Sequence, residues 1–285
     1  MLNFNLLAIS QLPVANWVEQ ATAWMTDTFA GLFDILQSLG ASVMDGLTSI
    51  LMMIPPAIFI LALAVIAYFV SNKRWSLPVF VLIGLGYVLN QGLWPELIDT
   101  VTLVLVSSLV SIIIGVPLGI LASKSDIADA IIKPVLDFMQ TMPAFVYLIP
   151  AVAFFGIGTV PGVFASVIFA LPPTVRMTNL GIRQVPVELD EAAEAFGSTG
   201  SQKLFKVELP LAKSTIMAGI NQTVMLALSM VVTGSMIGAP GLGRIVLSSL
   251  QRAQVGTGFV AGLGIVVLAI IIDRITNFAT EDSRR

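Results

Sequence analysis

Side chains that can do chemistry are concentrated in one stretch of this 285-residue chain, between Arg176 and Lys213. The chain contains no histidine and no cysteine, which excludes disulfides, zinc sites of the usual kind and histidine-based nucleophilic triads. It also lacks a Gly-x-x-x-x-Gly-Lys-[Ser/Thr] sequence, so it has no phosphate-binding loop of a nucleotide hydrolase. We therefore predict no catalytic residues, no metal and no cofactor, and we do not expect an enzyme.

Two short helices are predicted within this charged stretch. Pro186 suits the first turn of a helix, and the acidic residues after it lie at the positive end of the helix dipole. Gly197 should end this helix, because glycine tolerates a left-handed C-terminal cap. A second helix is predicted over residues 199–207, where Leu209-Pro210 would stop it. The alternative interpretation is a solvated linker between membrane spans.

The rest of the chain has the composition of a membrane protein. Apolar residues make up 56% and charged residues 11% of the sequence, whereas soluble domains are about 25% charged. The net charge of -3 offers no basic surface for nucleic acid, so we expect membrane lipid and no nucleic acid among the partners.

Charge-free stretches predict an all-α, polytopic integral membrane protein, because each span needs about 20 mostly apolar residues. About seven transmembrane helices are expected, since one long stretch carries a turn signal at Gly156 to Gly162 and reads as two helices. The predicted spans are residues 46–72, 75–95, 100–123, 138–175 with this turn inside it, 214–243 and 253–272.

The distribution of lysine and arginine predicts the orientation of these spans, because cations are retained on the cytoplasmic side. With the N-terminus outside and the C-terminus in the cytoplasm, twelve cations fall inside and only Arg244 and Arg252 fall outside. The predicted location is the plasma membrane, with several passes. Residues 1–45 contain no lysine or arginine, and their polar residues recur at helical spacing. They predict an amphipathic helix on the outer membrane surface with Trp17 and Trp24 at headgroup level, or a helix packed on the outer ends of the spans.

Four regions follow from this pattern. Residues 1–45 form an extracellular amphipathic segment, and residues 46–95 form two peripheral transmembrane helices. Residues 96–276 form a core of five transmembrane helices that includes a cytoplasmic loop at 184–213. Residues 277–285 form a cytoplasmic tail.

The charged stretch resembles the EAA loop of bacterial ABC importer permeases. Glu191-Ala192-Ala193, then Gly197, then Val207-Glu208-Leu209-Pro210 match its pattern, with Val207 where the family usually has isoleucine. The runs 139–150, 169–176 and 221–230 resemble the permease subunit of glycine betaine/proline (quaternary amine) ABC importers, and the likeness covers about residues 97–275. The resemblance implies that a separate ATPase docks on this loop. Carried over residue by residue, it assigns ATPase coupling to Glu191, Ala192, Ala193, Gly197, Leu209 and Pro210.

The resemblance also implies a substrate and partners. The substrate would be a compatible solute such as glycine betaine or proline betaine, moved by alternating access. The partners would be a second permease copy, two ATPase subunits that bind ATP and an extracellular substrate-binding protein. Three alternatives stay open: a permease for methionine, phosphonate or another small solute, an ion-coupled secondary carrier, and a non-transporting scaffold.

Prolines and polar residues in the spans point to a translocation path. Proline removes backbone hydrogen bonds that lipid cannot replace, so helices that contain Pro143, Pro172 or Pro173 should face protein or water. Aromatic faces attract a quaternary ammonium without hydrogen bonds. The candidate path residues are Phe138, Phe145, Tyr147, Asn221, Gln222 and Thr223, with packing or interhelical hydrogen bonding as the alternative. The Gly115/Gly119 pair predicts close helix packing.

Overall fold

The computed structural model describes residues 12–281, and every regular element in that range is a helix, which confirms the all-α prediction. Residues 1–11 of the predicted N-terminal segment and 282–285 of the predicted tail lie outside this range. The α-helices are α1 (Val14–Thr28), α2 (Ala30–Met53), α3 (Pro56–Val70), α4 (Ser76–Asn90), α5 (Trp94–Lys124), α6 (Asp126–Thr141), α7 (Leu148–Phe155), α8 (Thr159–Arg183), α9 (Val187–Ala195), α10 (Gly200–Lys203), α11 (Leu209–Ser235), α12 (Leu242–Gln251) and α13 (Val255–Glu281).

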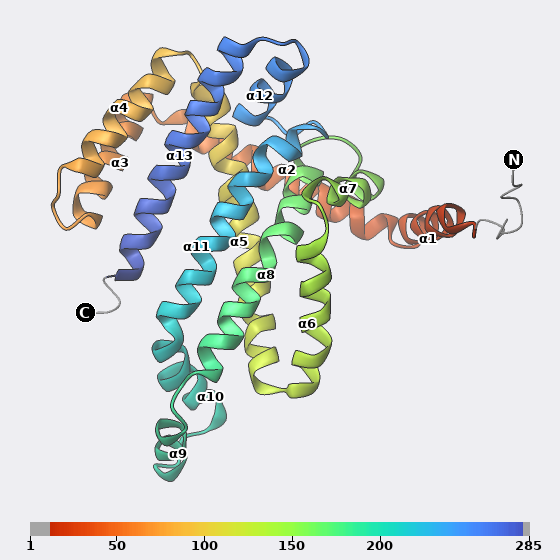
Figure 1. Ribbon diagram of the computed structural model, residues 1–285, viewed down its shortest axis with the longest axis vertical. Coiled ribbons are helices and arrows are strands. Elements are labelled where there is room, and N and C mark those ends of the chain that lie inside the picture. Colours follow the sequence, from red (N-terminus) through yellow and green to blue (C-terminus); the bar gives the residue numbers. More distant parts are fainter. Residues whose placement is uncertain (1–11, 282–285) are drawn as a thin grey trace, which may run out of the picture.

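Helices α5, α8 and α11 run side by side along the long axis of the molecule, with α6 and α13 beside them (Figure 1). Five helices are long and apolar enough to cross a membrane, or six if the bent α6–α7 pair counts as one span. The five are α2, α5, α8, the helix from Gly200 to Ser235 and α13. The protein is therefore a multi-pass membrane protein. Helices α3 and α4 are apolar but have only 15 residues each, which is about 22 Å of helix.

The contact between α5 and α8 depends on the absence of side chains at Gly115 and Gly119. A Cβ atom on Gly119 would lie 2.5 Å from Cβ of Thr178 and 2.7 Å from the carbonyl oxygen of Val175. A Cβ atom on Gly115 would lie 2.9 Å from Thr174. The predicted close packing at this glycine pair is confirmed. Pro172 and Pro173 are also buried within α8, as predicted for a helix that faces protein.

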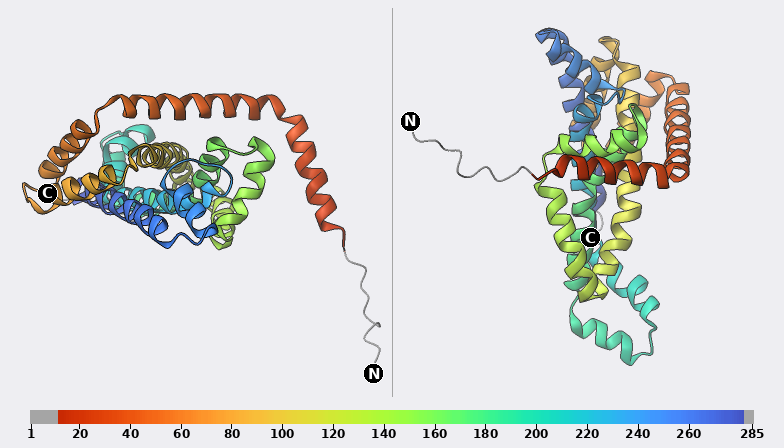
Figure 2. Two further views of the ribbon diagram at one scale, coloured as in Figure 1. Left: turned by 90° about the horizontal axis from the view of Figure 1, so that it is seen from above. Right: turned by 90° about the vertical axis from the view of Figure 1, so that its right-hand side faces the viewer.

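The N-terminal helices α1 and α2 lie across the long axis (Figure 2). Trp17 and Trp24 are exposed on α1, as an interfacial helix requires. Helix α2 also packs on the bundle, because Met44 is buried and the ring of Phe33 stacks on Phe154 of α7 with centroids 4.8 Å apart. Helix α2 therefore contacts the other helices, and the position of α1 on the membrane surface stays a prediction.

The first apolar helix after this segment begins ten residues later than the predicted span. Residue 46 lies inside α2, which continues to Met53, and α3 begins at Pro56. Pro55 and Pro56 lack backbone N–H donors, and Ile54 before them has extended backbone (ψ 120°). This proline pair, rather than the last acidic residue, sets the boundary.

The predicted helix from residue 138 to the turn at 156 is also different in the structure. Helix α6 begins at Asp126 and ends at Thr141, and the following helical segment, Ala144–Phe155, is bent from it by 110°. The bend follows from Pro143, because Met142 before it is extended (ψ 136°). The charge-free criterion missed residues 126–137 of α6, where acidic residues pair with arginines of α8.

Candidate functional site

The segment between α8 and α11, which we name the coupling loop (residues 184–208), lies at the opposite end of the molecule from α12 (Figure 1). Its first helix, α9, begins after Pro186, as predicted. Gly197 has a left-handed backbone (φ 78°), and its N–H donates to the carbonyl of Glu194 at 2.9 Å. The N–H of Ser198 donates to the carbonyl of Ala193 at 3.0 Å. This pair of bonds is a Schellman cap, so a side chain at position 197 would strain the end of α9.

Helix α10 folds back onto α9 and is held there by Lys203. Its ammonium lies 2.8 Å from Oδ2 of Asp190 and 2.7 Å from Oε1 of Glu194. The hydrogen bond from Lys203 holds the pKa of Asp190 below its ordinary value. A capping box between Thr199 and Gln202 satisfies the first turn of α10. The two helices of the loop therefore form a defined hairpin rather than a solvated linker.

Pro210 does not end the second helix of the loop, which corrects the prediction. Residues Leu204–Glu208 form a π-helical turn, and the N–H of Leu209 donates to the carbonyl of Leu204. The wider turn displaces the carbonyl that a proline ring would meet in an α-helix, and Pro210 falls in the first turn of α11. The loop consequently continues into α11 without a break.

The residues assigned to ATPase coupling lie on or near the surface of this hairpin. Glu191, Ala192, Gly197 and Pro210 are exposed, and Ala193 and Leu209 are half-buried. Large apolar side chains surround them: Phe196 is 91% exposed, Phe205 66% and Val187 65%. Exposed aromatic groups grouped on a polar loop are typical of a protein-binding surface.

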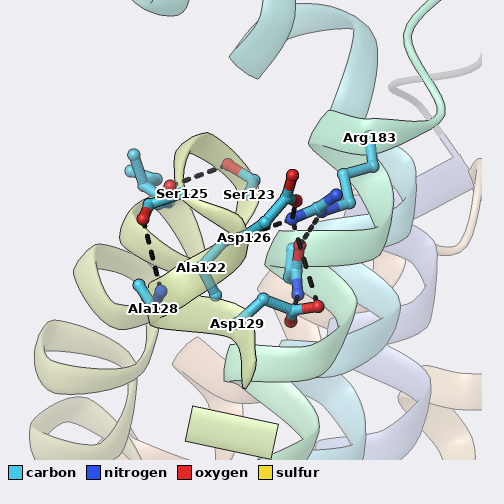
Figure 3. A network of polar contacts seen from close by, with 9 residues as sticks. Ala122, Ser123, Ser125, Asp126, Ala128, Asp129 and Arg183 are labelled. Atoms are coloured by element: carbon cyan, nitrogen blue, oxygen red, sulfur yellow. Dashed lines mark hydrogen bonds and ion pairs between the residues drawn. The ribbon is translucent and has the colours of Figure 1, made fainter. Parts of the chain in front are cut away.

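Four charged residues at the base of the loop form two ion pairs that the sequence did not predict. Nζ of Lys124, the last residue of α5, lies 2.5 Å from Oε1 of Glu208, and Glu208 is only 3% exposed. Arg183, the last residue of α8, lies 2.8 Å from Oδ1 of Asp126 and donates to the carbonyl of Ala122 at 2.9 Å (Figure 3). Glu208 could have indicated the Lys124 pair, because this carboxylate lies between the apolar residues Val207 and Leu209 and needs a cationic partner when it is buried.

The predicted path residues divide into exposed and bonded groups. Phe138 and Phe145 are 65% and 58% exposed, and Gln222 is exposed as well. Tyr147 is buried, and its hydroxyl donates to the carbonyl of Met139. The side-chain N–H of Asn221 donates to Asn277 at 2.7 Å.

Thr223 is fully buried in the contact between α11 and α8. Its hydroxyl lies 2.7 Å from that of Thr174 and 2.8 Å from the carbonyl oxygen of Ala170. Thr223 and Tyr147 therefore form hydrogen bonds to other helical segments, as expected from the alternative to a role in the path.

A polar recess lies at the end of the molecule that carries α12. Its volume is about 800 Å³, and Glu96 and Asp99 of α5 line it together with Arg244 of α12 and Arg252, which follows α12. These two arginines are the ones that the orientation argument places outside. Residues 12–281 contain no group of three or more acidic side chains that could hold a metal ion.

Comparison with known proteins gives consistent matches. Residues 115–281 match the family described as "Binding-protein-dependent transport system inner membrane component". The chain is 56% identical to the glycine betaine/carnitine transport permease GbuB of Listeria monocytogenes, over 94% of this chain and 95% of that protein. It is 50% identical to the glycine betaine transport system permease OpuAB of Bacillus subtilis, over 94% of each chain. It is 46% identical to the glycine betaine/proline betaine permease ProW of Escherichia coli, over 96% of this chain and 77% of that one.

Among solved structures, an inward-facing MetNI methionine ABC transporter matches with a TM-score of 0.61, over 68% of this chain and 96% of that chain. The identity is 22%, so this likeness concerns the fold alone. Because the family match covers more than half of the chain and the relatives match nearly all of it, this protein belongs to the binding-protein-dependent inner membrane components, the permease subunits of ABC importers.

Proposed function

We propose that this chain is the permease subunit of an ATP-driven importer for a compatible solute of the glycine betaine or proline betaine type. The observation that carries the proposal is the identity of 46% to 56% with glycine betaine transport permeases over at least 94% of the chain. A separate subunit binds and hydrolyses ATP, so this chain has no catalytic residue and needs no cofactor.

The coupling loop is the surface on which that ATPase docks. Glu191 presents an exposed carboxylate, and the small Ala192 and Ala193 let the partner's backbone approach closely. Gly197 keeps the end of α9 in the docking conformation, and Leu209 and Pro210 join the loop to α11.

The assembly contains two permease copies, two ATPase subunits and an extracellular binding protein. The family description, which names dependence on a binding protein, supports the last of these. The coupling loop faces the cytoplasm with the C-terminus, and the N-terminus is outside. The recess between α5 and α12, at the opposite end, then faces the binding protein. Closure of the ATPase pair draws the two coupling loops together and opens the helices outward, and hydrolysis reverses the change.

The path between the two faces uses the side chains that remain exposed in the single chain. Phe138 and Phe145 offer aromatic faces to the quaternary ammonium, and Gln222 offers an exposed polar group. Asn221 beside it is half-buried and contributes to the path from its bond to Asn277. Tyr147 and Thr223 act behind them by fixing the helices, because their hydroxyl groups are bonded inside the protein.

The test uses the complex of permease, ATPase and binding protein reconstituted in liposomes. Gly197→Val should abolish most ATP-dependent glycine betaine uptake while membrane insertion is retained, since valine is strained at a φ of 78°. Gly200→Val is the matched control, because no atom lies within 4 Å of a Cβ there and its φ is not positive. Unchanged uptake and ATPase stimulation in Gly197→Val would refute the coupling role.

The same preparation tests the substrate. Glycine betaine uptake should be inhibited by unlabelled proline betaine but not by methionine or a phosphonate. Uptake of methionine instead would identify another importer permease, and uptake without the ATPase would identify an ion-coupled carrier.

A further inference from the structure

Both ends of the coupling loop are bound to the same turn of the chain. Arg183 immediately precedes the loop and Glu208 is its last residue. Arg183 pairs with Asp126, and Glu208 pairs with Lys124. Lys124 and Asp126 are separated by Ser125 alone, in the turn that joins α5 to α6. The loop therefore leaves and re-enters the bundle at two points that converge on three consecutive residues.

The α5–α6 turn is short and internally bonded. Ser125 is its single non-helical residue, and its hydroxyl oxygen accepts the N–H of Ala128 at 3.2 Å. The carbonyl of Ser125 accepts the N–H of Asp129 at 2.9 Å. A displacement of this turn must consequently move the end of α5 and the start of α6 together. Figure 3 shows Arg183 pointing from α8 toward this turn and toward Asp129.

The Lys124–Glu208 pair also influences Asp190, a residue of α9 in the coupling loop. Lys203 lowers the pKa of Asp190 in α9 most strongly, and Glu208 and Lys124 lower it further. Oδ1 of Asp190 and Oε2 of Glu208 are both buried without a hydrogen-bond partner. Two sets of ion pairs therefore hold the coupling loop: Glu194 and Asp190 with Lys203 at the docking surface, and Glu208 with Lys124 of α5 at its base.

We propose that the α5–α6 turn is where displacement of the coupling loop enters the membrane helices, and that Lys124 and Glu208 are positioning residues for this transmission. The inference rests on the proposed function, because it needs an ATPase that moves the loop. Helix α6 then carries the displacement to the 110° bend before α7, which packs on α2 through Phe154 and Phe33. In the Lys124–Glu208 pair the cation belongs to α5 and the anion to the coupling loop. In the Arg183–Asp126 pair the cation belongs to α8, at the start of the loop, and the anion to α6.

The test measures substrate transported per ATP hydrolysed in the reconstituted complex. Glu208→Gln should lower this ratio about fivefold, within the range reported for residues on coupling networks, while ATP hydrolysis and ATPase binding persist. The charge exchange Lys124→Glu with Glu208→Lys should restore at least about half of the ratio, because it renews the ion pair. A structural role alone would lower uptake and hydrolysis in equal proportion, and that result would overturn the proposal.

A control ion pair joins α8 and α6, the two helices that Arg183 and Asp126 also connect. Arg176 lies 2.5 Å from Asp137 but is separated from the coupling loop by almost two turns of α8. Arg176→Gln should leave the transport ratio within about twofold of the unmodified protein, because its loss does not touch the loop. An effect as large as that of Glu208→Gln would contradict a special role for the α5–α6 turn.

A distance measurement keeps the proposal testable if Glu208→Gln fails to insert. The chain has no native cysteine, so spin labels can be placed at Ile127→Cys on α6 and Ser201→Cys on α10, both exposed. Their separation should stay constant when ATP is bound, since the turn and the loop move as one unit. A change in this separation would overturn the proposal. Failure of the unmodified complex to take up glycine betaine would instead count against the proposed substrate, since the label distance does not depend on it.

Discussion

The hydroxyl groups of Thr174 and Thr223 lie 2.7 Å apart in the contact between α8 and α11, where both residues are fully buried. Thr223 also reaches the carbonyl of Ala170. Thr223→Val keeps the shape of the side chain but leaves these groups without their partner. We expect a loss of about 1 to 2 kcal/mol in stability, seen as a lower Tm in nanodiscs.

Ser229→Ala is the control for this substitution, because the Ser229 hydroxyl is exposed and bonds only within its own helix, to Met225. Its effect should stay below about 0.5 kcal/mol. If Thr223→Val changed substrate preference and left the Tm unaltered, Thr223 would line the path instead of fixing the helices.

Because α5 and α8 are in close contact at Gly119, adding one methyl group there should lower the stability of the protein strongly. Gly119→Ala puts a Cβ atom against Thr178 and the Val175 carbonyl, and backbone atoms cannot yield without separating the helices. We expect a loss of about 1 to 3 kcal/mol, typical of overpacking, with less folded protein in the membrane. Gly262→Ala on α13 is the control, because nothing lies within 4 Å of a Cβ there. Equal yields and equal melting temperatures for the two variants would show that the helices separate easily.

Much of the helical core could be predicted from charge-free stretches, because desolvation of a charge in lipid is costly wherever the helix lies. The same rule failed at α6, whose acidic residues are neutralised by arginines on another helix. Such ion pairing depends on tertiary contacts between distant residues, so it leaves no periodic pattern in the sequence. The predicted start at residue 46 was wrong for a simpler reason, since the charge-free criterion places the boundary after Asp45, whereas Pro55 and Pro56 set the start of α3.

The coupling loop was predicted more fully, because its helix ends have local causes. Pro186, Gly197 and Thr199 act on their own turns, and all three function at the expected helix ends. Pro210 was misjudged because a π-helical turn, which has no clear sequence signature, accommodates it. The partnership of Glu208 with Lys124 joins residues 84 positions apart, and spacing alone could not reveal it.

Below neutral pH, the contact between α9 and α10 should weaken only in acid. Lys203 holds the pKa of Asp190 below the ordinary 3.8, so the folded hairpin binds fewer protons than the unfolded one. The stabilisation is therefore complete well above 3.8 and is lost as the pH falls through the lowered pKa. Hydrogen exchange of the α9 amides should show constant protection from about pH 5 to 8 and weaker protection below about pH 4.

Asp190→Asn should weaken this protection at neutral pH and remove most of its dependence on acid. Glu188→Gln is the control, because Glu188 is exposed in the same helix and forms no ion pair within residues 12–281. Similar protection in Asp190→Asn and the unmodified protein would show that the hairpin is held by other contacts.

The exposed aromatic residues of the coupling loop should dominate binding of the ATPase. Phe196 and Phe205 are 91% and 66% exposed, and burying a phenyl ring in a partner's groove gives one of the larger gains available to an interface. Phe196→Ala and Phe205→Ala should each weaken ATPase binding to nanodisc-embedded permease by about tenfold or more. Phe69→Ala is the matched control, because Phe69 is 67% exposed but lies on α3. Affinities that are the same in all three variants would place the docking surface elsewhere on the protein.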